Sequence, residues 1–321
     1  MSAMFRATLD RSSWQQRERA HHDRADALTA AHRRRASRGE KHPVWDFLFT
    51  YYSYAPARLR RWHPGAGIEL EDATERLGWR WYSPGTQPDS AVPDAAAFSS
   101  EKALFADLIE RMLRRTAARP GQFGCFGLHE WAMVYRDDEH RHGAALRLGQ
   151  VGTDAVVDAH ELRCTHYDAF RFFTPDAVPR NQPLDRAGQP EREQPGCLHA
   201  GMDVYKWAMK LGPLIPGELL LDAFELARDI RLLDMQAAPY DLSDWDVVPV
   251  PIETADGKAE YVRRQRGFAE RGNVLRQQLL AAWLGEGTGD QDAGSQSEHV
   301  SQTALEAESS IRSVITRSAA S

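Results

Sequence analysis

Apolar residues recur at helical spacing along most of the chain, and this pattern predicts a mainly α-helical protein. The clearest case is residues 218–235, where apolar side chains repeat at i, i+4, i+7 and i+11: Leu219, Ala223, Leu226 and Ile230. A helix is also predicted from Ser99 to the Pro120-Gly121 pair. The same spacing predicts further helices over residues 126–135, 167–173, 198–211 and 260–283.

The two ends of the chain differ from its middle. Residues 12–38 predict a polar helix with too few apolar positions for a deep core face, hence a solvated arm. Residues 285–321 hold no aromatic side chain and bury too little apolar area to offset their ordering entropy. We therefore expect a basic helical arm over 1–41, one multi-helix domain over 42–284 and a disordered acidic tail over 285–321. A β-hairpin in residues 65–84 is the main strand content expected.

Composition narrows the class of protein. Of 321 residues, 42% are hydrophobic and 27% charged, which is ordinary globular usage. The longest stretch without a charge, residues 47–57, is well short of the ~20 residues that a spanning helix needs, so no membrane span is expected. Three cysteines make no disulfide framework, and the start of the chain lacks a basic-then-apolar signal. A cytoplasmic location is therefore expected.

The net charge of −6 is an average over unlike pieces. The arm has ten basic and five acidic residues, a net of +5, whereas the tail has six acidic and two basic residues, a net of −4. The middle therefore carries −7. Any nucleic-acid surface there is expected to be a local patch rather than a field over the whole domain.

Common catalytic motifs do not occur. There is no phosphate-binding loop, no G-x-G-x-x-G and no G-x-S-x-G. His129-Glu130 begins like a metalloprotease helix, but Met133 stands where the second histidine is needed.

Each cysteine lies two or four residues before a histidine: Cys125 before His129, Cys164 before His166, and Cys197 before His199. His199 and Asp203 share a helix face, and Asp168 follows His166 by two residues. Such pairs suit a metal ion or a histidine oriented by a carboxylate. Core packing is the alternative, because cysteine and neutral histidine are often buried. The spacing matches no standard zinc signature, so no structural zinc site is predicted.

Aromatic and basic side chains form a second constellation. Flat rings near cations suit stacking on a base, and these are Tyr167, Phe170, Tyr205 and Trp207. Arginine runs suit DNA phosphates, and these are Arg58, Arg61, Arg263 and Arg264. Plain core packing of the rings and solvated arginine faces are the alternatives. Asp222, Glu225 and Asp229 share a helix face that Arg228 and Arg231 are placed to neutralise.

Five segments resemble a group of actinobacterial and proteobacterial proteins named 3-methyladenine DNA glycosylase: residues 42–47, 125–136, 163–173, 194–207 and 257–268. The resemblance spans residues 42–283. It implies a partner, duplex DNA with alkylated bases, and base-excision repair without a metal or cofactor. The alkylated purine would be flipped, stacked between aromatic rings, and cleaved as a carboxylate stabilises the oxocarbenium-like sugar.

The resemblance makes Asp203, Asp168 and Asp241, in that order, the candidate catalytic carboxylates, with His199 and His166 beside them. Helix-hairpin-helix glycosylases carry a Leu-Pro-Gly-x-Gly turn before their catalytic aspartate. Residues 215–217 match it partly, but Leu219 stands where the second glycine belongs. This departure weakens the transfer to Asp241.

Two other functions remain open. A metal-dependent enzyme would bind a divalent transition metal through His129, His166, His199 and Glu130 or Asp203, and act on a small molecule or nucleotide. A non-catalytic DNA-binding protein would use the basic arm and the arginine patches. Convergence of the three histidines within about 5 Å, near metal-ligand reach, favours the metal enzyme.

Overall fold

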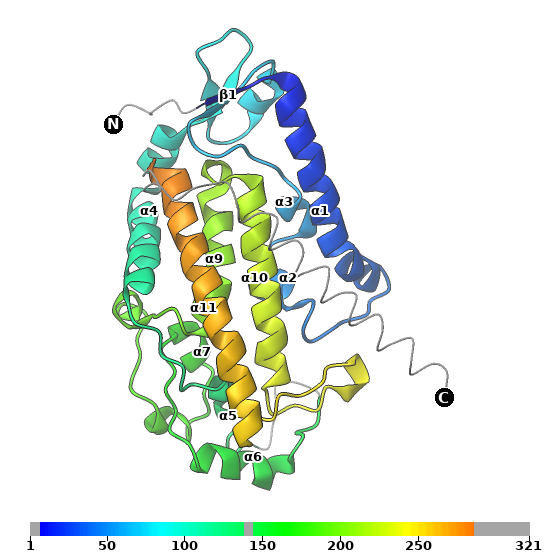
Figure 1. The fold of residues 1–321 in the computed structure, drawn as a ribbon, viewed down its shortest axis with the longest axis vertical. Helices are drawn as coiled ribbons and strands as arrows, with labels where there is room; N and C mark the ends of the chain where they lie inside the picture. The colour runs from blue at the N-terminus through cyan, green and yellow to red at the C-terminus, as the bar shows by residue number, and fades with distance from the viewer. Residues whose placement is uncertain (1–6, 138–143, 286–321) are drawn as a thin grey trace. The chain divides into compact units, whose positions relative to one another are not determined.

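Three long helices form the centre of the fold: α9 (Leu198–Leu211), α10 (Gly217–Gln236) and α11 (Ala255–Leu284). They pack against one another in the computed structural model, which describes residues 7–137 and 144–285 (Figure 1). Helix α4 (Ala95–Ala118) lies along α11, and α1 (Arg11–Ser37) lies along α10. The predicted mainly α fold is confirmed, whereas the predicted tail falls, from residue 286 on, outside the described residues.

Shorter elements connect these helices. The short α-helices are α2 (Phe47–Tyr51), α3 (Pro56–Leu59), α5 (Leu128–Ala132), α6 (Gly149–Asp158), α7 (Tyr167–Phe170) and α8 (Gln189–Arg192). The 3₁₀ turns are η1 (Thr74–Gly78), η2 (Val178–Arg180), η3 (Gly212–Leu214) and η4 (Ser243–Trp245). The prediction for α9 is confirmed to the residue. Helices α5 and α7 are shorter than their sequence patterns predict.

A small sheet contains the strand content, in the order β1-β2-β4-β3. Its strands are β1 (Ala7–Leu9), β2 (Ile68–Leu70), β3 (Tyr82–Pro84) and β4 (Ala91–Pro93). The prediction of a hairpin within residues 65–84 is wrong. The two strands of that segment, β2 and β3, do not pair with each other, because β4 lies between them. The antiparallel hairpin is β3–β4, whose second strand falls in a segment with a loop-like Pro/Ala/Ser composition.

Helix α1 has a buried face, so the expectation of a solvated arm is wrong on that side. Trp14 and Ala25 are buried, and the Trp14 indole N–H donates to the Glu71 carbonyl at 2.9 Å. His21 and Thr29 occupy the same buried face, which is why the apolar pattern looks sparse. Basic side chains on α1 pair with α10: Arg17 with Glu218, and Arg24 with Asp222 and Glu225.

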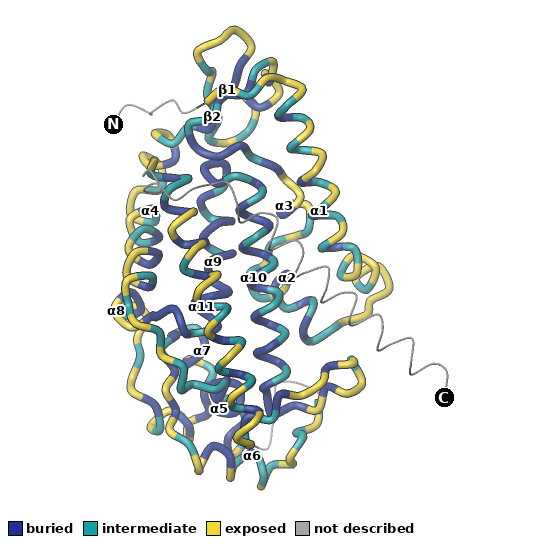
Figure 2. Tube along the Cα trace, in the orientation of Figure 1, coloured by how far each residue is buried: buried dark blue, intermediate teal, exposed yellow. Residues whose placement is uncertain are grey.

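Helices α9 and α10 run antiparallel at close range, so the start of α9 lies beside the end of α10. A Cβ added at Gly201 would lie 2.6 Å from Cδ1 of Ile230, which shows how closely the helices approach. Both helices are buried along most of their length (Figure 2). This junction, closed by α5 and α7, contains the residues of interest (Figure 1).

In the part of the chain that the structure describes, no helix combines the length and the apolar composition required to cross a bilayer.

Candidate functional site

The three predicted histidines lie together. His129 is on α5, His166 directly precedes α7, and His199 is in the first turn of α9. The ring centroid of His199 is 4.5 Å from that of His129 and 5.3 Å from that of His166. All three rings are buried. With Glu193, Asp203 and Asp234 they form a cluster that we call the buried polar centre.

One half of the buried polar centre contains His129, His199 and Asp234, whose candidate ligand atoms all lie within 4.8 Å of one another. His129 Nε2 is 2.7 Å from Asp234 Oδ1. Arg231 donates to the other oxygen of Asp234 at 2.7 Å and reaches Glu130 at 3.3 Å. Asp234 is thus held between an imidazole and a guanidinium, both buried.

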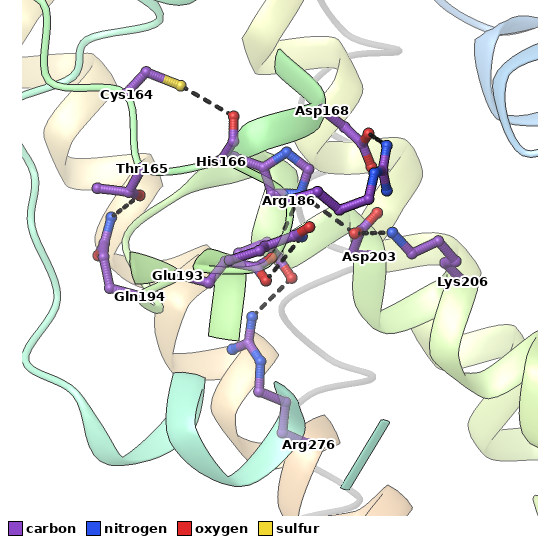
Figure 3. A network of polar contacts seen from close by, with 12 residues as sticks. Cys164, Thr165, His166, Asp168, Arg186, Glu193, Gln194, Asp203, Lys206 and Arg276 are labelled. Carbon is purple, nitrogen blue, oxygen red and sulfur yellow. Dashed lines mark hydrogen bonds and ion pairs between the residues drawn. The ribbon is translucent and has the colours of Figure 1, made fainter. Parts of the chain in front are cut away.

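The other half contains His166, Glu193 and Asp203, which likewise lie within 4.8 Å (Figure 3). His166 Nε2 is 3.3 Å from Asp203 Oδ2 and 3.4 Å from Glu193 Oε1. The Tyr52 hydroxyl donates to Asp203 Oδ1 at 2.8 Å, and the Lys206 ammonium contacts Asp203 Oδ2. Asp203 is therefore an anchored carboxylate with both oxygens in use.

Burial and ion pairing set the protonation states of the first half. Burial lowers the pKa of His129, but Asp234 outweighs it and the net pKa lies well above the usual value. Burial raises the pKa of Asp234, yet His129 and Arg231 bring it below the usual range. The pKa of His199 is lowered well below the usual value by burial and by nearby His129. His199 is consequently neutral, the form that binds metals.

In the second half, burial raises the pKa of Asp203, but Lys206 and His166 outweigh it and keep the carboxylate ionised. Burial raises the pKa of Glu193, and His166 offsets part of this rise. Arg276 of α11, buried nearby, has its pKa lowered to about 10 by burial and donates to the Ala200 carbonyl at 2.8 Å.

Two imidazole nitrogens of the buried polar centre lack a hydrogen-bond partner among the described residues: Nδ1 of His166 and Nδ1 of His199. Leaving a buried polar atom unpaired costs about 1–3 kcal/mol. Such atoms are uncommon in a folded protein and call for an explanation at each position.

The other predicted catalytic carboxylates, Asp168 and Asp241, belong to neither candidate ligand group. Asp168 is bound by Arg186 at 2.8 Å, with Arg171 at 3.5 Å (Figure 3). Asp241 is exposed and accepts from the Ser243 backbone N–H at 3.0 Å. Both carboxylates thus have local structural partners.

The predicted stacking residues pack mainly against protein. Tyr205 is buried among the rings of Tyr52, Tyr54 and Phe224. Phe170 packs on Phe173, Trp207 lies under Lys206, and Tyr167 lies under Arg186.

The two predicted arginine pairs lie at opposite ends of α10. Arg58 and Arg61 share a cavity with Leu220, whereas Arg264 donates to Gln236. Sixteen residues of helix separate Leu220 from Gln236, about 24 Å at 1.5 Å per residue. Arg263 pairs with Glu260 of its own helix.

Sequence reasoning missed Glu193 and the role of Asp234. Asp234 follows Ile230 by four residues and therefore lies on the apolar face of α10. This spacing alone predicts that the Asp234 side chain is buried. Glu193 lies in a proline-punctuated segment just after α8, where no periodic pattern marks a buried side chain. Glu130 is buried beside Arg231, and the two candidate ligand groups take their carboxylates from other residues.

Comparisons of this chain with protein-family models, with curated proteins and with solved structures gave no match in any of the three.

Proposed function

We propose that this chain is a metal-dependent enzyme that binds a divalent transition metal ion at His166, Glu193 and Asp203. One observation carries the proposal: the ligand atoms of Glu193 and Asp203 lie 3.4 and 3.3 Å from His166 Nε2. Metal–ligand bonds of ~2.0–2.2 Å in a tetrahedral site place neighbouring ligands about 3.3–3.5 Å apart. The same distances are long for hydrogen bonds to an ionised carboxylate.

The donor set and its surroundings support the same conclusion. Imidazole and carboxylate ligands suit zinc, iron and manganese, and ligand sites of this kind occur in the cores of helical bundles. His199, neutral and stacked on His166, is a further nitrogen donor. A bound ion would act as a Lewis acid or lower the pKa of a bound water. His129, protonated beside Asp234, would supply an acid within the same centre.

Arg231 links the buried polar centre to space that a small substrate could enter. Its guanidinium binds Asp234, lies 3.8 Å from the centroid of the Phe47 ring, and lines a cavity of about 780 Å³. That volume lies within the range of small-molecule sites. A substrate with an anionic group would be attracted to this arginine.

Lys206 makes the metal proposal sharply testable, because its ammonium competes with the ion for Asp203 Oδ2. Its side chain is 15% exposed, so it can move toward solvent as the ion binds. Lys206→Met should therefore tighten metal binding, whereas His166→Ala should abolish it. An ion-pair network with no metal role predicts no metal binding by either variant.

The experiment is metal analysis of purified protein, followed by Co²⁺ titration monitored through its visible absorption. We expect about one tightly bound ion per chain. His160→Ala is the matched control, because His160 lies just after α6, its ring bonds to the Val156 carbonyl, and it belongs to neither candidate ligand group. Equal metal content in wild type and His166→Ala, with circular dichroism showing that both are folded, would overturn the proposal.

A DNA glycosylase is a second proposal, supported by the ionised state of Asp203. An anionic carboxylate near Tyr52 and Tyr205 suits stabilisation of an oxocarbenium-like sugar. The geometry gives this function less support, since Asp203 is 1% exposed and the arginine pairs lie far apart. The test is release of alkylated purine from methylated duplex DNA in the presence of chelator, with Asp203→Asn as the inactive control. Absence of release by the wild type rules this function out.

A further inference from the structure

A second site lies between α3, the segment before β3, and the end of α9. This cavity, which we call the cationic pocket, has a volume of about 420 Å³ and is lined by Arg58, Arg61, Lys210, Tyr54, Trp79 and Trp81, among others. Its size falls within the range for small-molecule sites. The ring of Tyr205 packs between Tyr54 and Tyr52, which binds Asp203, so the pocket is separate from the buried polar centre.

Three cations of the cationic pocket have no anionic partner. The side chains of Arg58, Arg61 and Lys210 make no hydrogen bond or ion pair with any described residue. Their contacts are with ring faces: Arg58 lies 5.3 Å from the Tyr54 centroid and Arg61 lies 5.0 Å from that of Trp79. Among the described residues that line the pocket there is no Asp or Glu.

Other arginines of the same region show that partners are the local norm. Arg76 contacts both Trp79 and Glu18, and Arg80 contacts both Trp81 and Glu101. Among these neighbouring basic side chains, the unpartnered ones are thus those that line the pocket at Arg58, Arg61 and Lys210. Lys210 is also half-buried; burial and nearby Lys206 lower its pKa, and the charge of Asp203 offsets only part of this lowering, so an anion in the pocket would stabilise the ammonium further.

The aromatic side chains give the pocket flat apolar faces. Tyr54, Trp79 and Trp81 are each half-buried and line the pocket. Trp81 has a φ of +60°, a backbone conformation that bulky side chains rarely adopt, and its ring packs near Gly212 at the far wall. Strain of this kind is often found where a side chain is held in place for a ligand.

We propose that the cationic pocket binds a small, planar, multiply anionic molecule, for which a nucleoside monophosphate is the representative class. The flat ring would pack beside Trp79 and Trp81, whose faces also carry Arg61 and Arg80, while the phosphate is bound by Arg58, Arg61 and Lys210. Duplex DNA fits the observations less well. The pocket is concave and small, the other predicted arginine pair lies at the far end of α10, and Glu101 neutralises the neighbouring Arg80.

Calorimetric titration of the full chain with AMP, adenosine and inorganic phosphate tests this inference. We expect AMP to bind at least tenfold more tightly than either part alone, because only AMP uses both the rings and the cations. Arg61→Ala and Lys210→Met should each weaken AMP binding tenfold or more. Arg111→Ala, an exposed arginine on α4, is the matched control and should not change it.

Three results would overturn the inference: no AMP binding at millimolar concentration, equal affinity for AMP and phosphate, or no effect of Arg61→Ala. Tighter binding of a duplex oligonucleotide than of AMP, lost in the same variants, would also overturn it in favour of nucleic acid. The readout is binding in the absence of added metal, so the result stands apart from the proposed metal chemistry. Both side chains replaced are exposed or half-exposed, and circular dichroism checks that the variants fold.

Discussion

His63 is a partly buried histidine near the guanidinium groups of Arg61 and Arg76. Burial lowers its pKa to about 3, and Arg76, Arg61 and His21 act in the same direction. Its Nδ1 lies 3.0 Å from the Tyr82 hydroxyl, and its ring contacts Trp79. In the unfolded chain the pKa of histidine is ~6.5. The unfolded state therefore binds more protons than the folded state between about pH 3 and pH 6.5.

This difference predicts a pH effect on stability. The contribution of neutral His63 is fully present above pH ~6.5 and is lost as the pH falls toward 3, by up to ~1.4 kcal/mol per pH unit. His63→Phe keeps the ring but cannot be protonated, so the stability of wild type relative to this variant should decline below pH 6.5. Urea denaturation between pH 4 and pH 8 measures this. Parallel curves for the two proteins would contradict the assigned pKa.

Single residues also show where sequence reasoning succeeds. His129, His166 and His199 are found because each lies near a cysteine, and Asp203 because it follows His199 by one helical turn. The pairing of His129 with Asp234 joins residues 105 positions apart, and no local spacing reports such a contact. Patterns along the chain identify the side chains of the buried polar centre better than they identify which ones meet.

At the scale of the elements, the contact between α9 and α10 depends on Gly201. Gly201→Ala would place a methyl group 2.6 Å from Ile230 Cδ1 in a buried interface, and should lower the free energy of unfolding by about 1–3 kcal/mol. Ile230→Val removes that Cδ1. The double variant should therefore be more stable than the sum of the two single effects, by at least ~0.5 kcal/mol in urea denaturation.

Gly267→Ala on α11 is the control for this experiment. A Cβ at Gly267 would meet no atom within 4 Å, so the substitution should stabilise the helix by up to about 1 kcal/mol. Additive effects at Gly201 and Ile230 would show that the two helices adjust their separation rather than resist the methyl group.

Helices as units are predicted well, but their partners are not. Residues 198–211 are helical as expected because the apolar period is local information. The burial of α1 depends on Trp14 and Ala25 together with polar His21 and Thr29, so hydropathy alone misses it. The insertion of β4 between β2 and β3 likewise depends on a tertiary pairing, Leu70 with Ala91, which period-two patterns do not encode.

At the scale of the whole molecule, the charges of unlike segments compensate one another. Arg24 of the basic α1 pairs with Asp222 and Glu225 of α10, which were expected to form a solvated face balanced by arginines of α10 itself. Arg231, one of those expected partners, is instead buried with Asp234. Part of the net charge of +5 over residues 1–41 is thus neutralised where α1 packs against α10. Less of this positive charge remains to attract nucleic acid.

The buried polar centre joins distant parts of the described chain, so metal binding should stabilise all of them together. Its ligand candidates come from α5, α9 and α10, and from residues beside α7 and α8. An unfolded chain does not assemble this set, and binding energy therefore becomes folding energy. Above the dissociation constant, each tenfold increase in free metal should raise the free energy of unfolding by ~1.4 kcal/mol.

Urea denaturation in metal buffers, followed by circular dichroism, measures this dependence. His160→Ala should show the same dependence as wild type, because the His160 ring bonds to the Val156 carbonyl and belongs to neither candidate ligand group. His166→Ala should show none, since it lacks the nitrogen from which both carboxylate distances are measured. A wild-type stability that does not change with metal concentration would mean that the centre is a fixed ion-pair network. Its unpartnered imidazole nitrogens would then destabilise the folded state. The ion pairs of Lys206 with Asp203 and of Arg231 with Asp234 would offset this destabilisation.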